Sequence, residues 1–194
     1  MYSELFCQSN FSFLVGASSP EEIVTTASFL GYRAVAITDE CSVAGVVRAW
    51  RTIQQQQLEL QLIIGSEFYI EGHNMVLLAK NNQGYRQLCQ LITRGRRRSE
   101  KGSYQLFLND INRNDCADCF CLYALPRYGD DTSTLKYLQQ HFPGQLWLLA
   151  ENLLTNADAR HIQRLPHIAE TFKLPIVASS HVLMHIPSRK ILHD

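Results

Sequence analysis

The stretch AVAITDECSVAG, residues 34–45, decides the fold of this chain. It begins with a short apolar run rich in β-branched side chains, which predicts a buried strand over residues 34–38. Two acidic residues, Asp39 and Glu40, follow directly, and an apolar pattern with helical spacing begins at Val43. A buried strand, polar residues at its carboxyl end and then a helix form the repeating unit of a parallel α/β protein.

The same alternation of strands and helices continues along the chain. One predicted helix carries clear end signals, because Ser19 and Glu22 form an S-x-x-E capping box around Pro20, and Gly31 suits its C-terminus. Strands are also predicted over residues 5–7, 60–64, 68–70, 75–79, 119–125, 146–150 and 176–179, with a break at Gly65, and helices over 19–31, 43–56, 82–98, 132–141 and 157–172. This periodicity fits a barrel and an open doubly wound sheet equally well.

Length and composition are typical of one globular domain, and we expect residues 1–194 to form it. Of the 194 residues, 46% are hydrophobic and 19% charged. Eighteen basic and eighteen acidic side chains cancel, so the chain as a whole has no field that attracts nucleic acid. The sequence contains neither an apolar run of membrane-spanning length nor a signal-peptide pattern, and we therefore expect a cytoplasmic protein.

Three of the six cysteines lie close together in the sequence. Cys116, Cys119 and Cys121 suggest a zinc knuckle, but a closed zinc site needs four ligands, and neither a second C-x-x-C nor a histidine pair follows at the required spacing. Cys119 and Cys121 alternate within a strand pattern, which is typical of buried thiols. We therefore expect reduced, buried cysteines.

Several motifs resemble the PHP (polymerase and histidinol phosphatase) domain, in particular the one at the front of bacterial error-prone DNA polymerases. They are ELFCQSNFSFL at 4–14, AITDECSVAG at 36–45, IIGSEF at 63–68 and VLLAKN at 76–81. The segment PSRKILHD at 187–194 looks like the family's exit toward its polymerase body. The resemblance implies an α/β fold, a distorted (β/α)7 barrel of mostly parallel strands wrapped by helices.

The resemblance also identifies positions where metal ligands are missing. The family's opening motif carries an H-x-H that binds metal, and Phe6 and Gln8 stand at those two positions. Its closing G-D-V-H-M-H corresponds to SHVLMH at 180–185, where His181 replaces the aspartate and Leu183 replaces the inner histidine. A phenyl ring and an alkyl chain have no lone pair for a cation, and a carboxamide is a weak ligand. Phe6, Gln8 and Leu183 are therefore lost ligand positions.

Three residues remain as a residual metal site. By resemblance, Asp39 and Glu67 match family metal ligands, and His181 follows the last predicted strand. Candidate neighbours of this set are Glu40, His73, Asn74, Glu151 and His185. Three ligands can hold a single zinc, manganese or iron ion but cannot hold a multi-ion cluster. We expect no bound metal, with Asp39 and Glu67 capping loops or pairing with Arg33 or Arg48, and His181 hydrogen-bonded in the pocket.

One basic run departs from the overall charge balance. It comprises Arg94, Arg96, Arg97, Arg98 and Lys101, at the end of a long predicted helix. Such a run is typical of a surface that contacts a DNA backbone or an acidic partner. It is equally typical of a solvated helix end, where cations favour the helix dipole. The family that the chain resembles is basic here too, so both interpretations stay open.

The sequence leads to two functional hypotheses. In the first, the chain is a degenerate, non-catalytic PHP domain that serves as a structural or interaction module and contacts a polymerase body or another replication or repair protein. The palm carboxylates of a polymerase are not present in it, so it does not polymerise DNA alone. In the second, it is a metal-dependent phosphoesterase acting on nucleotides, DNA ends or pyrophosphate, with one ion on the residual site and His185 or Glu40 relaying the proton.

Overall fold

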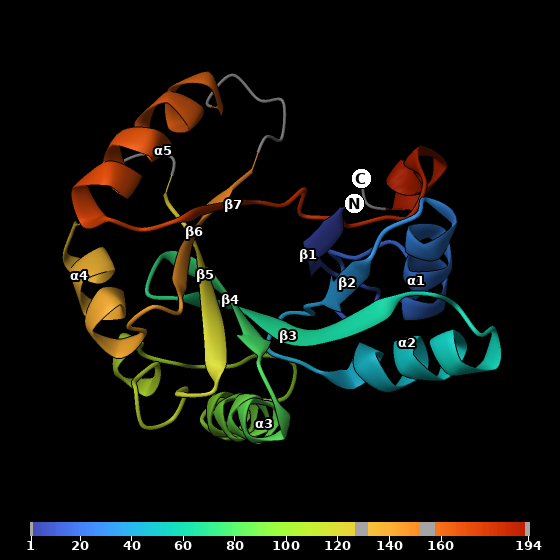
Figure 1. The fold of residues 1–194 in the computed structure, drawn as a ribbon. Coiled ribbons are helices and arrows are strands. Elements are labelled where there is room, and N and C mark those ends of the chain that lie inside the picture. Colours follow the sequence, from blue (N-terminus) through green and yellow to red (C-terminus); the bar gives the residue numbers. More distant parts are fainter. Residues whose placement is uncertain (1, 127–131, 152–157, 193–194) are drawn as a thin grey trace. The chain divides into compact units, whose positions relative to one another are not determined.

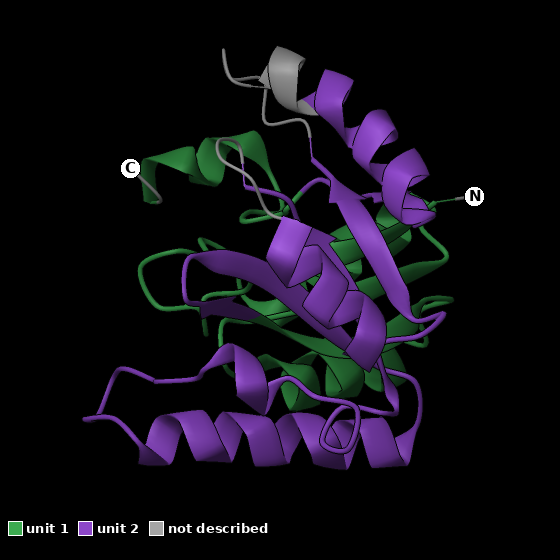
Figure 2. Ribbon diagram, turned by 90° about the vertical axis from the view of Figure 1, so that its left-hand side faces the viewer, with its two compact units in different colours: residues 1–67, 181–194 green, residues 68–180 purple. Residues whose placement is uncertain are grey.

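The computed structural model describes residues 2–126, 132–151 and 158–192, and of residues 158–161 the backbone only. The chain forms two compact units (Figure 2). Residues 1–67 and 181–194 make the first, and residues 68–180 make the second. The first unit is thus built from both ends of the chain, with the second inserted between them.

The first unit is a parallel sheet with two helices (Figure 1). Its elements are β1 (Ser3–Cys7), α1 (Pro20–Phe29), β2 (Ala34–Ile37), α2 (Ala44–Gln55), β3 (Gln61–Ile70, whose last three residues belong to the second unit) and the 3-10 helix η2 (Pro187–Leu192). β2 pairs with both β1 and β3 in parallel. The core consists of apolar side chains from these helices and strands, among them Ile23, Val24, Ile37, Val46 and Ile53.

The ends of α1 are those that the sequence predicts. Ser19 and Glu22 form the reciprocal capping box, in which each side chain accepts a hydrogen bond from the other residue's backbone N–H. Gly31 follows the helix with φ of +72°, a left-handed conformation that glycine adopts without strain.

The predicted break at Gly65 is wrong, because β3 continues through it without interruption. Gly65 is buried in extended backbone, where the sheet's hydrogen bonds outweigh the weak strand propensity of glycine. The chain reverses later, at Glu71 and Gly72, which both have positive φ. A two-residue turn of this kind joins antiparallel strands, so β4 runs antiparallel to β3.

The second unit continues the alternation. Its elements are β4 (His73–Ala79), α3 (Asn82–Arg97), the 3-10 helix η1 (Leu108–Asp110), β5 (Cys119–Ala124), α4 (Thr132–His141), β6 (Leu146–Ala150), α5 (Asp158–Phe172) and β7 (Ile176–Ala178). β5, β6 and β7 are parallel, and β4 is antiparallel to β5. The predicted α/β class with mostly parallel strands is confirmed. The predicted start of α5 at residue 157 lies outside the described residues.

The cysteines near β5 are packing residues. Cys116, Cys119 and Cys121 are buried free thiols, and burial raises the pKa of Cys116 and Cys119 to about 12. A thiol with so high a pKa stays protonated near neutral pH and is a poor metal ligand. In the part of the chain that the structure describes, no helix is both long and apolar enough to span a bilayer.

Candidate functional site

Polar side chains converge at one edge of the sheet in the first unit. Gln8 directly follows β1 and Asp39 lies just beyond β2. Glu67 lies three residues beyond the point where β3 stops pairing with β2. Isolated bridges join Glu40 to Glu67 and Cys7 to Val182, which brings the segment that begins at His181 beside β1. The carboxyl ends of parallel strands are where functional side chains gather in such folds.

Gln8 is the central residue of this site. Its side chain is buried, its amide nitrogen donates to the Glu67 carboxylate, and its amide oxygen lies 3.2 Å from Nε2 of His181. A carboxylate only accepts hydrogen bonds, so Glu67 fixes which end of the amide faces it. The amide oxygen then faces His181, whose Nε2 must carry a hydrogen in order to donate. Gln8 thus connects two of the three expected residual ligands, and we name this pair of hydrogen bonds the Gln8 bridge.

Phe6 and His181 form a stacked pair. Their ring centroids are 3.9 Å apart and the ring planes differ by 9°. Burial lowers the pKa of His181 to about 4, against a smaller opposing effect of the Glu4 charge. His181 is therefore neutral at pH 7. Phe6 is fully buried and supplies packing surface at a position where the resemblance expects a metal donor.

Asp39 is held by two serines. Its carboxylate accepts hydrogen bonds from Ser9 N at 2.7 Å, from Ser9 Oγ at 2.9 Å and from Ser12 Oγ at 2.9 Å. Burial raises the pKa of Asp39, while the hydrogen bonds from Ser9 and Ser12 lower it. Of the two arrangements predicted for this carboxylate, loop capping is the one seen among the described residues, where its partners are Ser9 and Ser12. Arg48, one of the two arginines considered, binds Glu21 at 2.7 Å instead.

The surroundings of Asp39 are tightly packed. Ser12 Oγ also accepts a hydrogen bond from the backbone N–H of Glu40 at 2.9 Å. A Cβ atom at Gly45, near the start of α2, would lie 2.6 Å from Oδ2 of Asp39 and 3.1 Å from Oγ of Ser9. Only glycine fits there without a shift, so the backbone itself closes this side of the carboxylate.

The segment after His181 is fastened to the N-terminus of α1. Leu183 takes part through its backbone, whose carbonyl accepts from Ala17 N at 2.8 Å. Nδ1 of His185 lies 2.7 Å from Oγ of Ser18. The hydrogen bonds of His185 therefore involve the cap of α1, and its ring is not joined to the Gln8 bridge.

The other candidate neighbours belong to the second unit. His73 begins β4, and both its ring nitrogens are engaged, Nδ1 with the Tyr123 hydroxyl at 2.8 Å and Nε2 with Thr134 Oγ1 at 3.1 Å. Asn74 lies opposite Ala124 in the β4–β5 ladder. Glu151 follows β6. Within its own unit His73 is thus a hydrogen-bonded structural histidine.

Sequence reasoning missed Ser9, Ser12, Tyr123 and Thr134. The two serines lie in the quoted opening motif, and they would have been found by asking which donors could satisfy a buried Asp39. Tyr123 and Thr134 have no comparable signal, because their partner His73 is about 50 and about 60 positions away in sequence.

The donor set does not fit a cluster of metal ions. Among the described residues, no three His, Cys, Asp or Glu side chains are arranged to hold an ion. The Asp39 carboxylate faces serine donors, and Glu67 and His181 face opposite ends of one amide. A multi-ion site needs many donors that converge on the ions.

Comparison with known proteins establishes the family. The model of the PHP domain matches residues 4–166. This chain belongs to the PHP domain family. It is 46% identical over 189 residues to an error-prone DNA polymerase of Vibrio campbellii and 44% identical over 194 residues to one of Pseudomonas aeruginosa. These matches cover 97% and 100% of this chain, and the chain spans 18% of the length of each relative.

Two solved structures share the fold. One, from Bifidobacterium adolescentis and described as a metal-dependent phosphoesterase, has a TM-score of 0.63 at 13% identity and is matched over 96% of this chain and 88% of its own. Another, an amidohydrolase from Chromobacterium violaceum with bound sulfate, has a TM-score of 0.62 at 13% identity and is matched over 95% and 88%. At this identity the likeness concerns the fold, and it agrees with the α/β architecture expected of a PHP domain.

Proposed function

We propose that residues 1–194 form the PHP module of an error-prone DNA polymerase and that this module is structural and protein-binding rather than catalytic. Its similarity to error-prone DNA polymerases over its whole length supports the first half of the proposal. The Gln8 bridge carries the second half. In this proposal Phe6, Gln8 and Leu183 stand at positions where an active family member places metal ligands.

The Gln8 bridge opposes metal binding in three ways. A cation would have to displace the Gln8 amide from Glu67. It would also require His181 to lose its Nε2 hydrogen, since an imidazole nitrogen that carries a proton has no lone pair to donate. Finally, His181 would have to leave its stack on Phe6 if the ring turned toward an ion. Each change removes a contact that stabilises the site without any metal.

The partner in this proposal is a polymerase body or another replication or repair protein. In the relatives, the matched region is one part of a much longer polypeptide. Residues 187–194 are the proposed exit segment toward that body. Arg189 pairs with Glu22 of the α1 capping box, so the described part of this segment is anchored to the first unit. Anchoring of this kind suits a module that holds its position beside a neighbour.

A metal-dependent phosphoesterase is the second candidate, with a single ion on Asp39, Glu67 and His181. It is favoured by the convergence of these residues at one edge of the first unit. The ion, when bound, would activate a water molecule for attack on a phosphoryl group, with Glu40 or His185 moving the proton. This candidate requires Glu67→Gln to abolish hydrolysis.

Phosphate release from nucleotides, pyrophosphate and a 3′-phosphorylated oligonucleotide, with zinc, manganese or iron added, separates the two candidates. The structural proposal expects no release above buffer from the natural chain. The matched positive control is the triple variant Phe6→His, Gln8→His, Leu183→His, which restores imidazoles at the three lost positions. Hydrolysis by the natural chain that disappears in Glu67→Gln would establish the phosphoesterase instead.

A further inference from the structure

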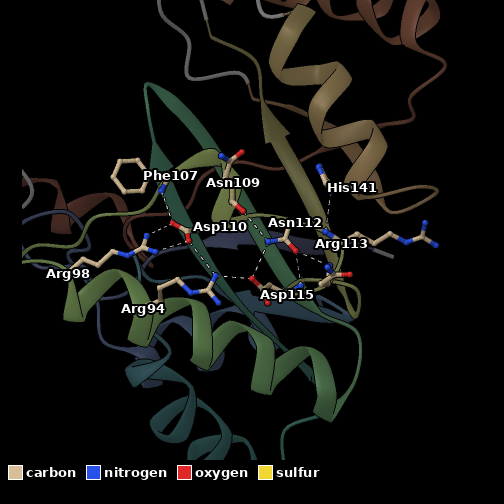
Figure 3. Close-up of polar contacts among 10 residues, drawn as sticks. Arg94, Arg98, Phe107, Asn109, Asp110, Asn112, Arg113, Asp115 and His141 are labelled. Carbon is tan, nitrogen blue, oxygen red and sulfur yellow. Dashed lines mark hydrogen bonds and ion pairs between the residues drawn. The ribbon is translucent and has the colours of Figure 1, made fainter.

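The structure divides the arginines at the end of α3 into two groups (Figure 3). Arg94 and Arg98 both extend toward Asp110, and Arg94 also binds Asp115 at 2.8 Å. Burial alone would raise the pKa of Asp110, but hydrogen bonds from Arg98 and from Phe107 N, together with both arginine charges, lower it. These two arginines therefore fasten the segment around η1 to α3, and their charge is largely compensated.

Two of the three remaining cations face solvent. Arg97 and Lys101 are exposed, and neither forms an ion pair among the described residues. Arg96 lies over the ring of Tyr104, with its guanidinium carbon 5.5 Å from the ring centroid. Arg96 also donates a hydrogen bond to Ser103 O at 3.3 Å and is only partly exposed. The positive charge that a polyanion can meet therefore comes mainly from Arg97 and Lys101 and not from the whole basic run.

Aromatic rings lie beside the arginines at the end of α3, and Tyr69 and Phe107 nearby are exposed. Tyr104 Oη accepts a hydrogen bond from Tyr69 N at 2.9 Å, and the Tyr69 side chain is 60% exposed. Phe107 is 44% exposed, and the guanidinium carbon of Arg98 lies 5.6 Å from the centroid of its ring. Leu108 N donates to Glu71 Oε2 at 3.2 Å, so residues 104–108 run alongside residues 69–71. We name the set Tyr69, Arg96, Arg97, Lys101, Tyr104 and Phe107 the Arg–aromatic surface.

A groove on α3 adjoins this surface. It has a volume of about 520 Å³ and is lined by Cys89, Gln90, Thr93, Arg94, Arg97 and Arg98. Arg97 thus belongs to the groove and to the Arg–aromatic surface alike. An extended polymer could lie in this groove along α3, with the exposed side chain of Arg97 at one end.

We propose that the Arg–aromatic surface binds single-stranded nucleic acid. The exposed rings of Tyr69 and Phe107 can accept stacked bases of any sequence, and the exposed cations Arg97 and Lys101 can bind the phosphates between them. A duplex keeps the faces of its bases stacked inside, so it would use the cations but not the rings. Two exposed acidic residues, Glu71 after β3 and Glu100 after α3, reduce the positive potential that attracts phosphates. Binding should therefore be weak and sensitive to salt. This inference does not depend on whether the first unit binds metal.

Fluorescence anisotropy of the full 194-residue chain with labelled oligothymidine tests the proposal, using strands about 16 nucleotides long. Phe107→Ala should weaken binding roughly 5- to 100-fold, because a stacking partner is lost. Phe107→Tyr should restore it. Arg97→Ala should weaken binding and lower the slope of log affinity against log salt by about one. Exposed residues of the first unit provide matched controls: Phe29→Ala for the ring and Arg51→Ala for the charge, and neither should change binding.

Two further ligands decide the class of partner. Duplex DNA of the same length should bind more weakly than the single strand, and its affinity should not change in Phe107→Ala. Polyglutamate should bind more weakly still. The proposal is overturned if oligothymidine does not bind at about 50 mM salt, if Phe107→Ala and Arg97→Ala bind it as the natural chain does, or if polyglutamate binds as tightly as the single strand, which would indicate an acidic protein partner. Circular dichroism of each variant verifies that it is folded.

Discussion

The polar site around Gln8 in the first unit and the basic end of α3 in the second unit contrast in what their sequences suggest. At the site around Gln8, the resemblance predicts that ligands are lost at Phe6 and Gln8, and in the structure Gln8 is hydrogen-bonded to Glu67 and His181. At α3, the sequence shows an excess of cations, and the structure shows Arg94 and Arg98 compensated by Asp110. In both places the availability of a polar group is set by partners distant in sequence. The residue type alone does not reveal it.

The largest effect should come from Gln8→Glu, which places a second carboxylate against Glu67 in a buried site. We expect a loss of roughly 3–5 kcal/mol in the free energy of unfolding at pH 7, the range for an uncompensated buried charge. Repulsion and burial raise the pKa of the new carboxyl, so the loss should shrink as the pH falls through that raised pKa. Urea unfolding at pH 7 and at pH 5 measures both effects.

Gln8→Met is the matched control, since it removes the hydrogen bonds without adding charge. It should cost about 1–3 kcal/mol, the cost of leaving buried polar groups unsatisfied. If Gln8→Glu and Gln8→Met are equally stable at pH 7, Glu67 is not charged in the pocket and our description of the Gln8 bridge is wrong.

His181 should make stability depend on pH. Its folded pKa of about 4 lies below its usual value of 6.5, so the unfolded chain binds more protons between these two values. The stabilisation is therefore complete above about pH 6.5 and is lost as the pH falls toward 4, by a total of about 3 kcal/mol. His181→Asn suits the left-handed backbone at this position, φ +49°, and does not titrate. Chemical unfolding from pH 7 to pH 4 should show a shallower acid loss for this variant than for the natural chain, and equal slopes would contradict the prediction.

Asp110→Asn tests the pairing at the end of α3. Asp110 is nearly buried and accepts from Arg98 and from Phe107 N. Its replacement should cost about 1–3 kcal/mol, since charge-assisted hydrogen bonds are lost. Asp115→Asn is the matched control, and because the Asp115 side chain is 37% exposed, it should cost at most about 1 kcal/mol. Thermal unfolding of both variants measures the two losses in stability. A larger loss in Asp115→Asn than in Asp110→Asn would contradict the prediction.

Arg97→Ala should have the smallest effect on stability. Its side chain is exposed and forms no ion pair among the described residues, so the free energy of unfolding should change by less than about 0.5 kcal/mol. A larger loss, measured by the same urea titration, would mean that Arg97 has a structural role like that of Arg94. The contrast between the two groups of arginines would then disappear.

Local signals in the sequence predict much of the fold. The capping box at Ser19, the glycine at Gly31 and the apolar runs around Asp39 act within a few residues of themselves, so their structural consequences can be inferred directly. The continuity of β3 through Gly65 is not encoded locally, because strand pairing between segments distant in sequence outweighs the weak strand propensity of glycine.

The site is less predictable for the same reason. The family resemblance identified Asp39 and Glu67 as candidates, and the position of His181 after the last predicted strand added the third, since topology gathers such positions at one edge of a sheet. Their hydrogen-bond partners were not predictable, since Gln8 binds Glu67 across 59 positions and His181 across 173. A carboxylate or imidazole that binds metal and one that is only hydrogen-bonded are the same residue type. They differ in their hydrogen-bond partners, which are distant in sequence.

Metal content is the most direct test of the central claim, that the polar groups around Gln8 are satisfied by neighbouring side chains and hold no cluster of cations. Inductively coupled plasma mass spectrometry should be applied to the natural chain purified without chelator, with the Phe6→His, Gln8→His, Leu183→His variant prepared in parallel. We predict well under one equivalent of zinc, manganese and iron combined in the natural chain and a higher content in the variant. Two or more equivalents in the natural chain, lost in Glu67→Gln, would contradict the account.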